Sequence, residues 1–282
     1  MSSALARRTP IRIFALPLTR SAAASKLPRP TFYAFRITPP PSKPKLVAPN
    51  PGIFARWLPE EGLGKWASHK ANETWIGWGQ APTGSMKQRA FQTGERLMNQ
   101  LEFEETNLKS LDLSIAPPLK DLRVEKGDEI PLFYTPTMLS GPQSLENLKA
   151  LVDQRIPVHS RGMYTWIFFA ILSAPLKLIP IIPNFPFYFC AWRTWSHLKA
   201  RRAAQYLKSL IENNRIVPEP LHDLTAVYAA PGSDQLVNKE ALARAVRALG
   251  MSIEEEKALF HAQEQVRVRL EKDQGVESKK MD

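Results

Sequence analysis

The feature that most constrains this chain is a long apolar stretch interrupted by prolines. Residues 163–192 contain a single charged side chain, Lys177, among 30 residues. Prolines at positions 175, 180, 183 and 186 exclude one straight helix through the second half, because proline lacks an amide hydrogen and clashes with the preceding turn. About 20 apolar residues cross the ~30 Å hydrocarbon core of a bilayer as a helix. The stretch therefore exceeds one span and falls short of two.

Three arrangements are open for this stretch. It could form a single helix over 163–182, a re-entrant or interfacial hairpin bent at the prolines, or a buried core element. The charges around it favour a membrane, because basic residues beside an apolar segment attract anionic head groups. No acidic residue lies between Asp153 and Glu212, whereas eight basic ones do. The sequence therefore predicts a membrane segment, with its basic C-terminal flank on the matrix face.

A basic amphipathic helix is expected after the apolar stretch. Its positive side chains predict attachment to an anionic lipid surface, and an ordinary surface helix with a solvated charged face is the alternative. The candidate lipid-binding residues are Arg193, Lys199, Arg201, Arg202 and Lys208.

The excess positive charge of the chain lies at its start. Residues 1–59 contain ten basic side chains and no acidic one, whereas residues 60–282 hold 28 basic and 27 acidic residues. This distribution argues against a nucleic-acid-binding patch in the folded part, which would keep the excess in its body. Residues 1–30 are typical of a mitochondrial presequence, which is rich in Arg and Ser and poor in acids. A disordered basic tail or an RNA-binding arm is the alternative.

Periodicity and turn signals predict the rest of the organisation. Residues 31–59 form a proline-rich linker, and folding begins near Glu60. Residues 60–160 form a helical region with a helix over 86–101, a short strand at 130–134 and a helix from Pro142. Residues 161–212 hold the membrane segment and the basic helix. Residues 213–282 form a helical hairpin around Gly250, with a capping box of Ser252 and Glu255. The predicted fold class is mainly α, with helical blocks flanking a proline-kinked apolar membrane segment and little β.

The sequence contains no pattern typical of an enzyme. The five histidines show no metal-ligand spacing, and one cysteine, Cys190, cannot build a disulfide or a thiolate metal centre. We therefore expect no catalytic site, metal or cofactor. His159 and His197 flank the membrane candidate, and they are interpreted as packing residues or, alternatively, as pH sensors.

Several blocks of the sequence resemble a known family. They are RIFALPLT (12–19), FYTP (133–136), HSRG (159–162) and IPIIPNFPFYFCAWRTWSHLKA (179–200). On these blocks the chain resembles the fungal family described as mitochondrial K+/H+ exchange-related. The resemblance implies a place in the mitochondrial inner membrane and a role in potassium–proton exchange or its regulation. If the RIFALPLT block belongs to the mature fold, the presequence cannot be removed as a whole.

The composition of the apolar stretch argues against a chain that carries out the exchange by itself. An exchanger of K+ and H+ usually needs a carboxylate in the membrane, which can be protonated or can bind a cation. The apolar stretch has none. We therefore predict an accessory or regulatory component, with Lys177, Asn184 and Arg193 as ion-pathway candidates. The alternative is a non-transporting scaffold or assembly factor that binds cardiolipin and a protein partner. A matrix RNA-binding factor requires the apolar stretch to be core, and we expect no nucleic-acid partner.

Overall fold

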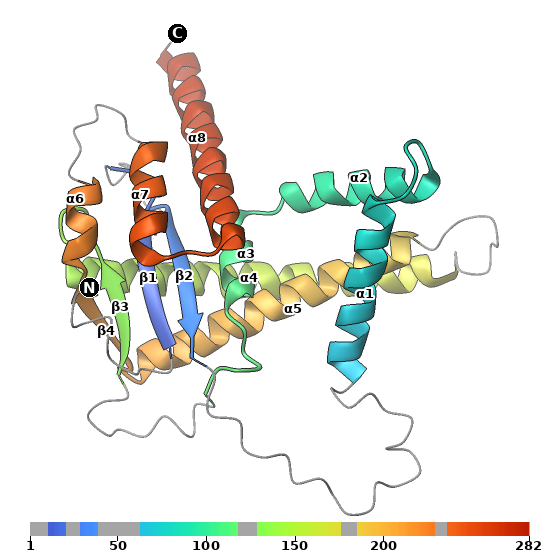
Figure 1. Ribbon diagram of the computed structural model, residues 1–282, viewed down its shortest axis with the longest axis horizontal. Helices are drawn as coiled ribbons and strands as arrows, with labels where there is room; N and C mark the ends of the chain where they lie inside the picture. Colours follow the sequence, from blue (N-terminus) through green and yellow to red (C-terminus); the bar gives the residue numbers. More distant parts are fainter. Residues whose placement is uncertain are drawn as a thin grey trace, which may run out of the picture. The chain divides into compact units, whose positions relative to one another are not determined.

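The chain divides into two compact units, residues 1–40 with 102–282 and residues 41–101. A computed structural model describes residues 11–20, 29–38, 63–117, 129–175, 185–228 and 236–281 (Figure 1). The strands are β1 (Ile11–Pro17), β2 (Thr31–Ile37), β3 (Ile130–Tyr134) and β4 (Ile216–Pro220). The helices of the first unit are α3 (Phe103–Ser110), α4 (Gly141–Ser173), α5 (Phe185–Glu212), the short η3 (His222–Leu224), α6 (Thr225–Tyr228), α7 (Lys239–Leu249) and α8 (Ile253–Met281).

The first unit is built on a mixed sheet of four strands in the order β2-β1-β3-β4. β1 pairs with β2 in antiparallel fashion, with Phe14 opposite Ala34. β1 and β3 run parallel, as do β3 and β4. The chain passes from β3 to β4 through α4 and α5, which agrees with the rule that parallel strands need a long crossover connection.

Both faces of this sheet are buried. On one face, Phe14 and Leu16 pack in a core cluster with residues of α7 and α8, among them Leu242 and Leu259. On the other face, Ile13 packs with residues of α4 and α5. Successive side chains of a strand point to opposite faces, so β1 supplies both clusters in alternation. Figure 1 shows α7 and α8 on one side of the sheet and α4 and α5 on the other.

Helices α4 and α5 form a long hairpin. α4 begins with a capping box, in which the Ser140 hydroxyl accepts from the Gln143 amide while the Gln143 side chain accepts from the Ser140 amide. The two helices lie side by side (Figure 1), and the rings of Trp166 and Phe189 meet edge to face at 5.4 Å between centroids. The half of the hairpin near the sheet supplies core residues, among them Leu148 and Leu207.

The second unit contains α1 (Leu63–Gly79) and α2 (Met86–Asn99). Trp75 of α1 packs against Phe91 of α2, with 4.9 Å between ring centroids. Its indole nitrogen donates to Glu95 at 3.1 Å. Gly94 leaves room for this indole, because a Cβ there would lie 2.1 Å from Cη2 of Trp75.

The predicted fold class is wrong in two respects. The chain contains a four-stranded sheet, and two of its strands lie in ranges predicted as a leader and a linker. Residues 11–17 were hard to recognise as a strand because both faces of β1 are buried, so its apolar side chains do not alternate with polar ones. The proline-rich composition of 31–59 likewise obscured β2.

The membrane segment is the second correction. Among the described residues, no helix combines the length and the apolar character needed to cross a bilayer. The apolar stretch is divided instead between the end of α4, at Ser173, and the start of α5, at Phe185. Prolines separate the two parts, and α5 becomes charged from Arg193 onward.

Other predictions are confirmed. The strand at 130–134 is β3, the helix over 86–101 is α2, and a helix begins around Pro142. The C-terminal hairpin is formed by α7 and α8, with Gly250 at a φ of 56°. In the predicted capping box, the Ser252 amide donates to Glu255 at 2.7 Å and the Glu255 amide donates to Ser252 Oγ at 3.2 Å.

Candidate functional site

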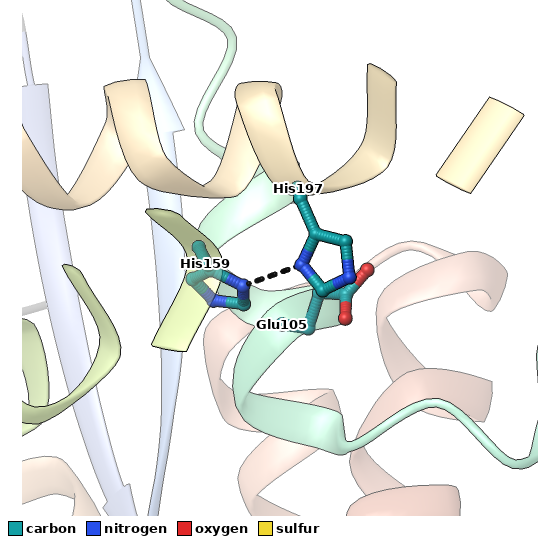
Figure 2. A group of neighbouring side chains, drawn as sticks. All are labelled: Glu105, His159 and His197. Carbon is teal, nitrogen blue, oxygen red and sulfur yellow. Dashed lines mark hydrogen bonds between the residues drawn. The ribbon is translucent and has the colours of Figure 1, made fainter. Parts of the chain in front are cut away.

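Three elements bring titratable side chains together at the middle of the hairpin. Glu105 comes from α3, His159 from α4 and His197 from α5 (Figure 2). All three are buried, and one nitrogen or oxygen atom of each lies within 4.8 Å of the others. Gly162, one turn beyond His159, makes space for the second imidazole, because a Cβ there would lie 2.6 Å from Cε1 of His197.

Arginine and serine side chains of α5 complete the cluster. Arg193 donates through Nη1 to Oε1 of Glu105 at 2.8 Å and through Nη2 to Nε2 of His197 at 2.9 Å. The Ser196 hydroxyl donates to the same Glu105 oxygen at 2.6 Å. Lys109 of α3 in turn donates to Ser196 at 2.9 Å. The carboxylate thus has several donors within reach and ties α3 to α5.

These contacts fix the proton positions on the two imidazoles. A guanidinium has no acceptor, so Nε2 of His197 accepts from Arg193 and the ring proton lies on Nδ1. That proton is donated to Nδ1 of His159, 3.1 Å away (Figure 2). His159 then carries its own proton on Nε2, an atom that has no hydrogen-bond partner within the described part of the chain. Both imidazoles are neutral in this arrangement.

The electrostatics agree with neutral histidines and an ionised carboxylate. Burial, together with the charges of Arg155 and Arg193, lowers the pKa of His159 to about 4. Burial and Arg193 also lower the pKa of His197. Burial opposes ionisation of Glu105, but the hydrogen bond from Ser196 and the charge of Arg193 outweigh it, so its pKa lies below the usual value. With a pKa of about 4, His159 is neutral near pH 7.

The residue types would suit a metal ion, but their hydrogen bonds do not. Two imidazoles and a carboxylate are common transition-metal ligands. Here Nδ1 of His197 carries a proton, and both oxygens of Glu105 accept hydrogen bonds from Arg193. A divalent cation would also add to the positive charges of Arg193 and Lys109, which already outnumber the negative charge of Glu105. The cluster is therefore arranged as a hydrogen-bonded network rather than an open coordination site.

A second ion-pair group borders this network. Glu104 accepts from Arg269 of α8 at 2.6 Å and lies 3.1 Å from a nitrogen of Arg155 of α4. Arg155 also contacts Glu102. The two adjacent glutamates of α3 thus contact different helices. Glu105 pairs with α5, and Glu104 pairs with α4 and α8.

The structure separates the residues predicted as sites. Arg193 lies in the buried network, and Lys208 pairs with Asp153 at 2.8 Å on the surface. Lys199 and Arg202 are exposed on α5, and Arg201 is half-buried. Lys177 and Asn184 lie outside the described residues. Of the three ion-pathway candidates, Arg193 alone lies within the part of the chain that the structure describes.

The sequence held one unused signal for this cluster. In a helical hairpin, residues equally distant from the turn face each other across it. His159 and His197 are equally distant in sequence from position 178, which lies in the proline-rich segment between α4 and α5. Glu105 could not be found this way, because α3 precedes the hairpin and a long connection separates them.

Residues 12–211 match the protein family described as mitochondrial K+-H+ exchange-related. The chain belongs to this family. The matched range begins in β1 and ends in α5, so it includes every residue of the buried network. Membership in the K+-H+ exchange-related family associates the chain with mitochondria, and it confirms the resemblance inferred from the sequence blocks.

Two fungal relatives are similar over about half of this chain. An uncharacterized protein of Saccharomyces cerevisiae is 26% identical over 171 residues, which cover 54% of this chain and 53% of the relative. An uncharacterized protein of Schizosaccharomyces pombe is 26% identical over 166 residues, covering 55% of this chain and 68% of the relative. The chain thus matches only about half the length of the first relative. No solved structure matches the chain significantly.

Proposed function

We propose that this protein acts at the mitochondrial inner membrane as an accessory or regulatory component of potassium–proton exchange. Its family supports the process and the organelle. The accessory role is supported by one observation above all, the pairing of the buried carboxylates. Glu105 is held by Arg193 and Ser196, and Glu104 by Arg269 and Arg155.

This pairing bears on transport because a K+/H+ exchanger needs a carboxylate that alternates between a proton and a cation. The guanidinium of Arg193 and the ammonium of Lys109 beside the ionised Glu105 repel K+. The lowered pKa of Glu105 disfavours the proton as well. The apolar stretch at 163–192 supplies no other acidic side chain. A chain with these properties fits a component that acts on an exchanger better than the exchanger itself.

Swelling of mitochondria in potassium acetate tests the role in exchange. Mitochondria lacking the protein should swell at an altered rate, and re-expression of the protein should restore it. Reconstitution tests the accessory character. Vesicles that contain only the purified chain and a trapped pH dye should show no potassium-driven proton flux. Unchanged swelling would remove the exchange role, and flux from the purified chain would remove the accessory one.

A second candidate is a non-transporting scaffold or assembly factor attached to the membrane. The exposed aromatic and aliphatic side chains at the end of the α4–α5 hairpin, such as Phe168 and Tyr188, favour a surface that meets another component. This candidate predicts normal swelling in mitochondria lacking the protein, together with the loss of a complex on native gels.

A further inference from the structure

The end of the α4–α5 hairpin that points away from the sheet is apolar on its outer surface. On α4, Phe168, Ile171 and Leu172 are 62%, 69% and 64% exposed, and on α5 Tyr188 is 64% exposed. The inner side of the same turns is filled by contacts such as that between Trp166 and Phe189. A helical element that is apolar on its inner and its outer side fits an apolar environment.

The order of side chains along each helix changes in the same way. On α4, exposed Arg161 is followed by Tyr164 and then by the aliphatic and aromatic residues. On α5, exposed Tyr188 leads to Trp195 and then to Lys199 and Arg202. Both helices therefore pass from an apolar end through an aromatic residue to a basic one. Tyr and Trp favour the membrane–water interface, and basic residues favour anionic head groups.

The described turns of the apolar end are about as long as one leaflet of a bilayer is deep. Nine residues separate Tyr164 from the last residue of α4, Ser173, which is about 14 Å at ~1.5 Å per residue. One leaflet supplies about 15 Å of the ~30 Å hydrocarbon core. The distance on α5 from Phe185 to Trp195 is ten residues, or about 15 Å.

The buried network lies where the apolar end begins. Arg193 contacts Glu105 and also lies 5.9 Å from the ring centroid of Trp166 and 5.7 Å from that of Trp192. Its charge is thus satisfied inside the protein, beneath the aromatic residues. Lys199 and Arg202, farther along α5, remain at the surface for external anions.

We propose that the end of the α4–α5 hairpin docks on an anionic lipid bilayer, inserting Tyr164–Ser173 and the first turns of α5 into the leaflet that faces the protein. Arg161, Lys199 and Arg202 then contact lipid phosphates. This inference supplies the partner surface for the proposed function. Vesicle binding by the purified chain tests it separately from the swelling assay, so either can fail alone.

Flotation of the purified full chain with vesicles tests the apolar contact. The chain should float with phosphatidylcholine vesicles that contain cardiolipin. Ile171→Asp should weaken binding at least tenfold, because a carboxylate is costly in hydrocarbon. Ile253→Asp is the matched control, since Ile253 is an isoleucine of 72% exposure at the start of α8. Equal binding of the two variants would overturn the proposal.

Paired charge reversals test the contacts between basic side chains and lipid phosphates. Lys199→Glu with Arg202→Glu should reduce binding to cardiolipin vesicles at least tenfold, and added salt should reduce wild-type binding. Arg244→Glu with Arg247→Glu, on exposed positions of α7 with the same spacing, should leave binding unchanged. Equal effects of the two pairs would overturn the proposed contacts of Lys199 and Arg202 with lipid phosphates.

The depth of insertion and the self-association of the chain distinguish this proposal from deeper insertion and from a dimer interface. A fluorophore attached at Phe168→Cys, in a Cys190→Ser background, should be quenched by nitroxide lipids of the leaflet that faces the protein and not by those of the opposite leaflet. Quenching from the opposite leaflet alone would contradict one-leaflet insertion. A dimer that Ile171→Asp dissociates, with vesicle binding unchanged, would assign the face to a second copy of the chain and overturn the proposal.

Discussion

The two facing histidines set a pH dependence at the scale of single residues. Burial and nearby positive charges lower the pKa of His159 to about 4, against about 6.5 in an unfolded chain. Above pH 6.5 the imidazole is neutral in both states and contributes nothing. Between pH 6.5 and 4 the unfolded chain binds a proton that the folded chain refuses, so the free energy of unfolding falls, by up to about 3 kcal/mol at pH 4.

His159→Asn isolates this effect, because the amide oxygen can replace Nδ1 as an acceptor but does not titrate. Urea unfolding at pH 7.5 and pH 5 should show a smaller acid loss for His159→Asn than for the wild type, by about 2 kcal/mol. His222→Asn, at an exposed position of η3, is the control and should behave as the wild type does. Equal acid losses in all three proteins would contradict the lowered pKa.

Gly162 is the residue that admits the second imidazole. A methyl group there would meet three ring atoms of His197 at 2.6 to 2.9 Å, and this ring is held by Arg193 and His159. Gly162→Ala should therefore destabilise the protein by about 1–3 kcal/mol in thermal or urea unfolding. Gly77→Ala is the control, because Gly77 also lies within a helix but has nothing within 4 Å of its would-be Cβ. It should be neutral or stabilising. Similar losses at both glycines would contradict the packing argument.

At the scale of elements, the Glu105–Arg193 pair joins α3 to the hairpin. Arg193→Met should destabilise the fold by about 3 kcal/mol, because it leaves a buried carboxylate without its guanidinium. Adding Glu105→Gln should recover part of that loss, since it removes the unpaired charge. A double-mutant cycle in urea checks this coupling. Strictly additive losses would show that the two side chains act independently.

The same contacts between α3 and α5 determine whether the buried cluster can bind a metal ion. In the wild type, Arg193 occupies Glu105 and His197, so added Zn²⁺ should not raise the melting temperature. Arg193→Met frees Nε2 of His197 and Oε2 of Glu105, so this variant should gain a zinc-dependent rise in melting temperature. A rise in the wild type that His159→Asn abolishes would show that the cluster opens to a metal.

The burial of β1 limits how much of the N-terminus proteolytic processing can remove. Ile13 and Phe14 are almost fully buried, and Phe14 stacks on Phe133 of β3 with 5.1 Å between ring centroids. Removal of residues 11–17 would take away the strand that joins β2 to β3. Mass spectrometry of the protein from mitochondria should therefore find an N-terminus at or before Ile11. A mature protein that starts after Pro17 would contradict the place of β1 in the sheet.

Local side-chain patterns predict some elements of this fold and not others, for physical reasons. Amphipathic helices such as α2 and α7, and the capping box of Ser252 and Glu255, follow from such patterns and are predicted by them. β1 was not, because a strand buried on both faces lacks alternation and its Arg12 matched a targeting composition. The site depends on contacts across the hairpin and from α3, which no local pattern of Glu105 reveals.

At the scale of the whole molecule, the hairpin has two different halves. The near half packs Leu151 and Leu210 into the sheet core, and the far half exposes Phe168 and Tyr188. The buried polar network separates them. Such a boundary agrees with the proposed docking on a bilayer, because the near half stays packed on the sheet while the far half presents apolar side chains.

A destabilising substitution in one unit should leave the hydrogen-exchange protection of the other unit unchanged. The core clusters of the first unit consist of its own strands and helices, whereas α1 and α2 are held by Trp75, Phe91 and the space at Gly94. Gly94→Leu places a side chain where the Trp75 ring lies, so it should unfold the α1–α2 packing. Hydrogen exchange read by mass spectrometry should then show faster exchange within 63–99 and unchanged protection of β1, β3 and α5.

Phe14→Ala should give the reverse pattern, with protection lost in the sheet, because it removes a buried ring at a cost of about 3–5 kcal/mol. If Gly94→Leu lowered protection in the sheet as much as Phe14→Ala does, the two units would form one cooperative fold instead of two.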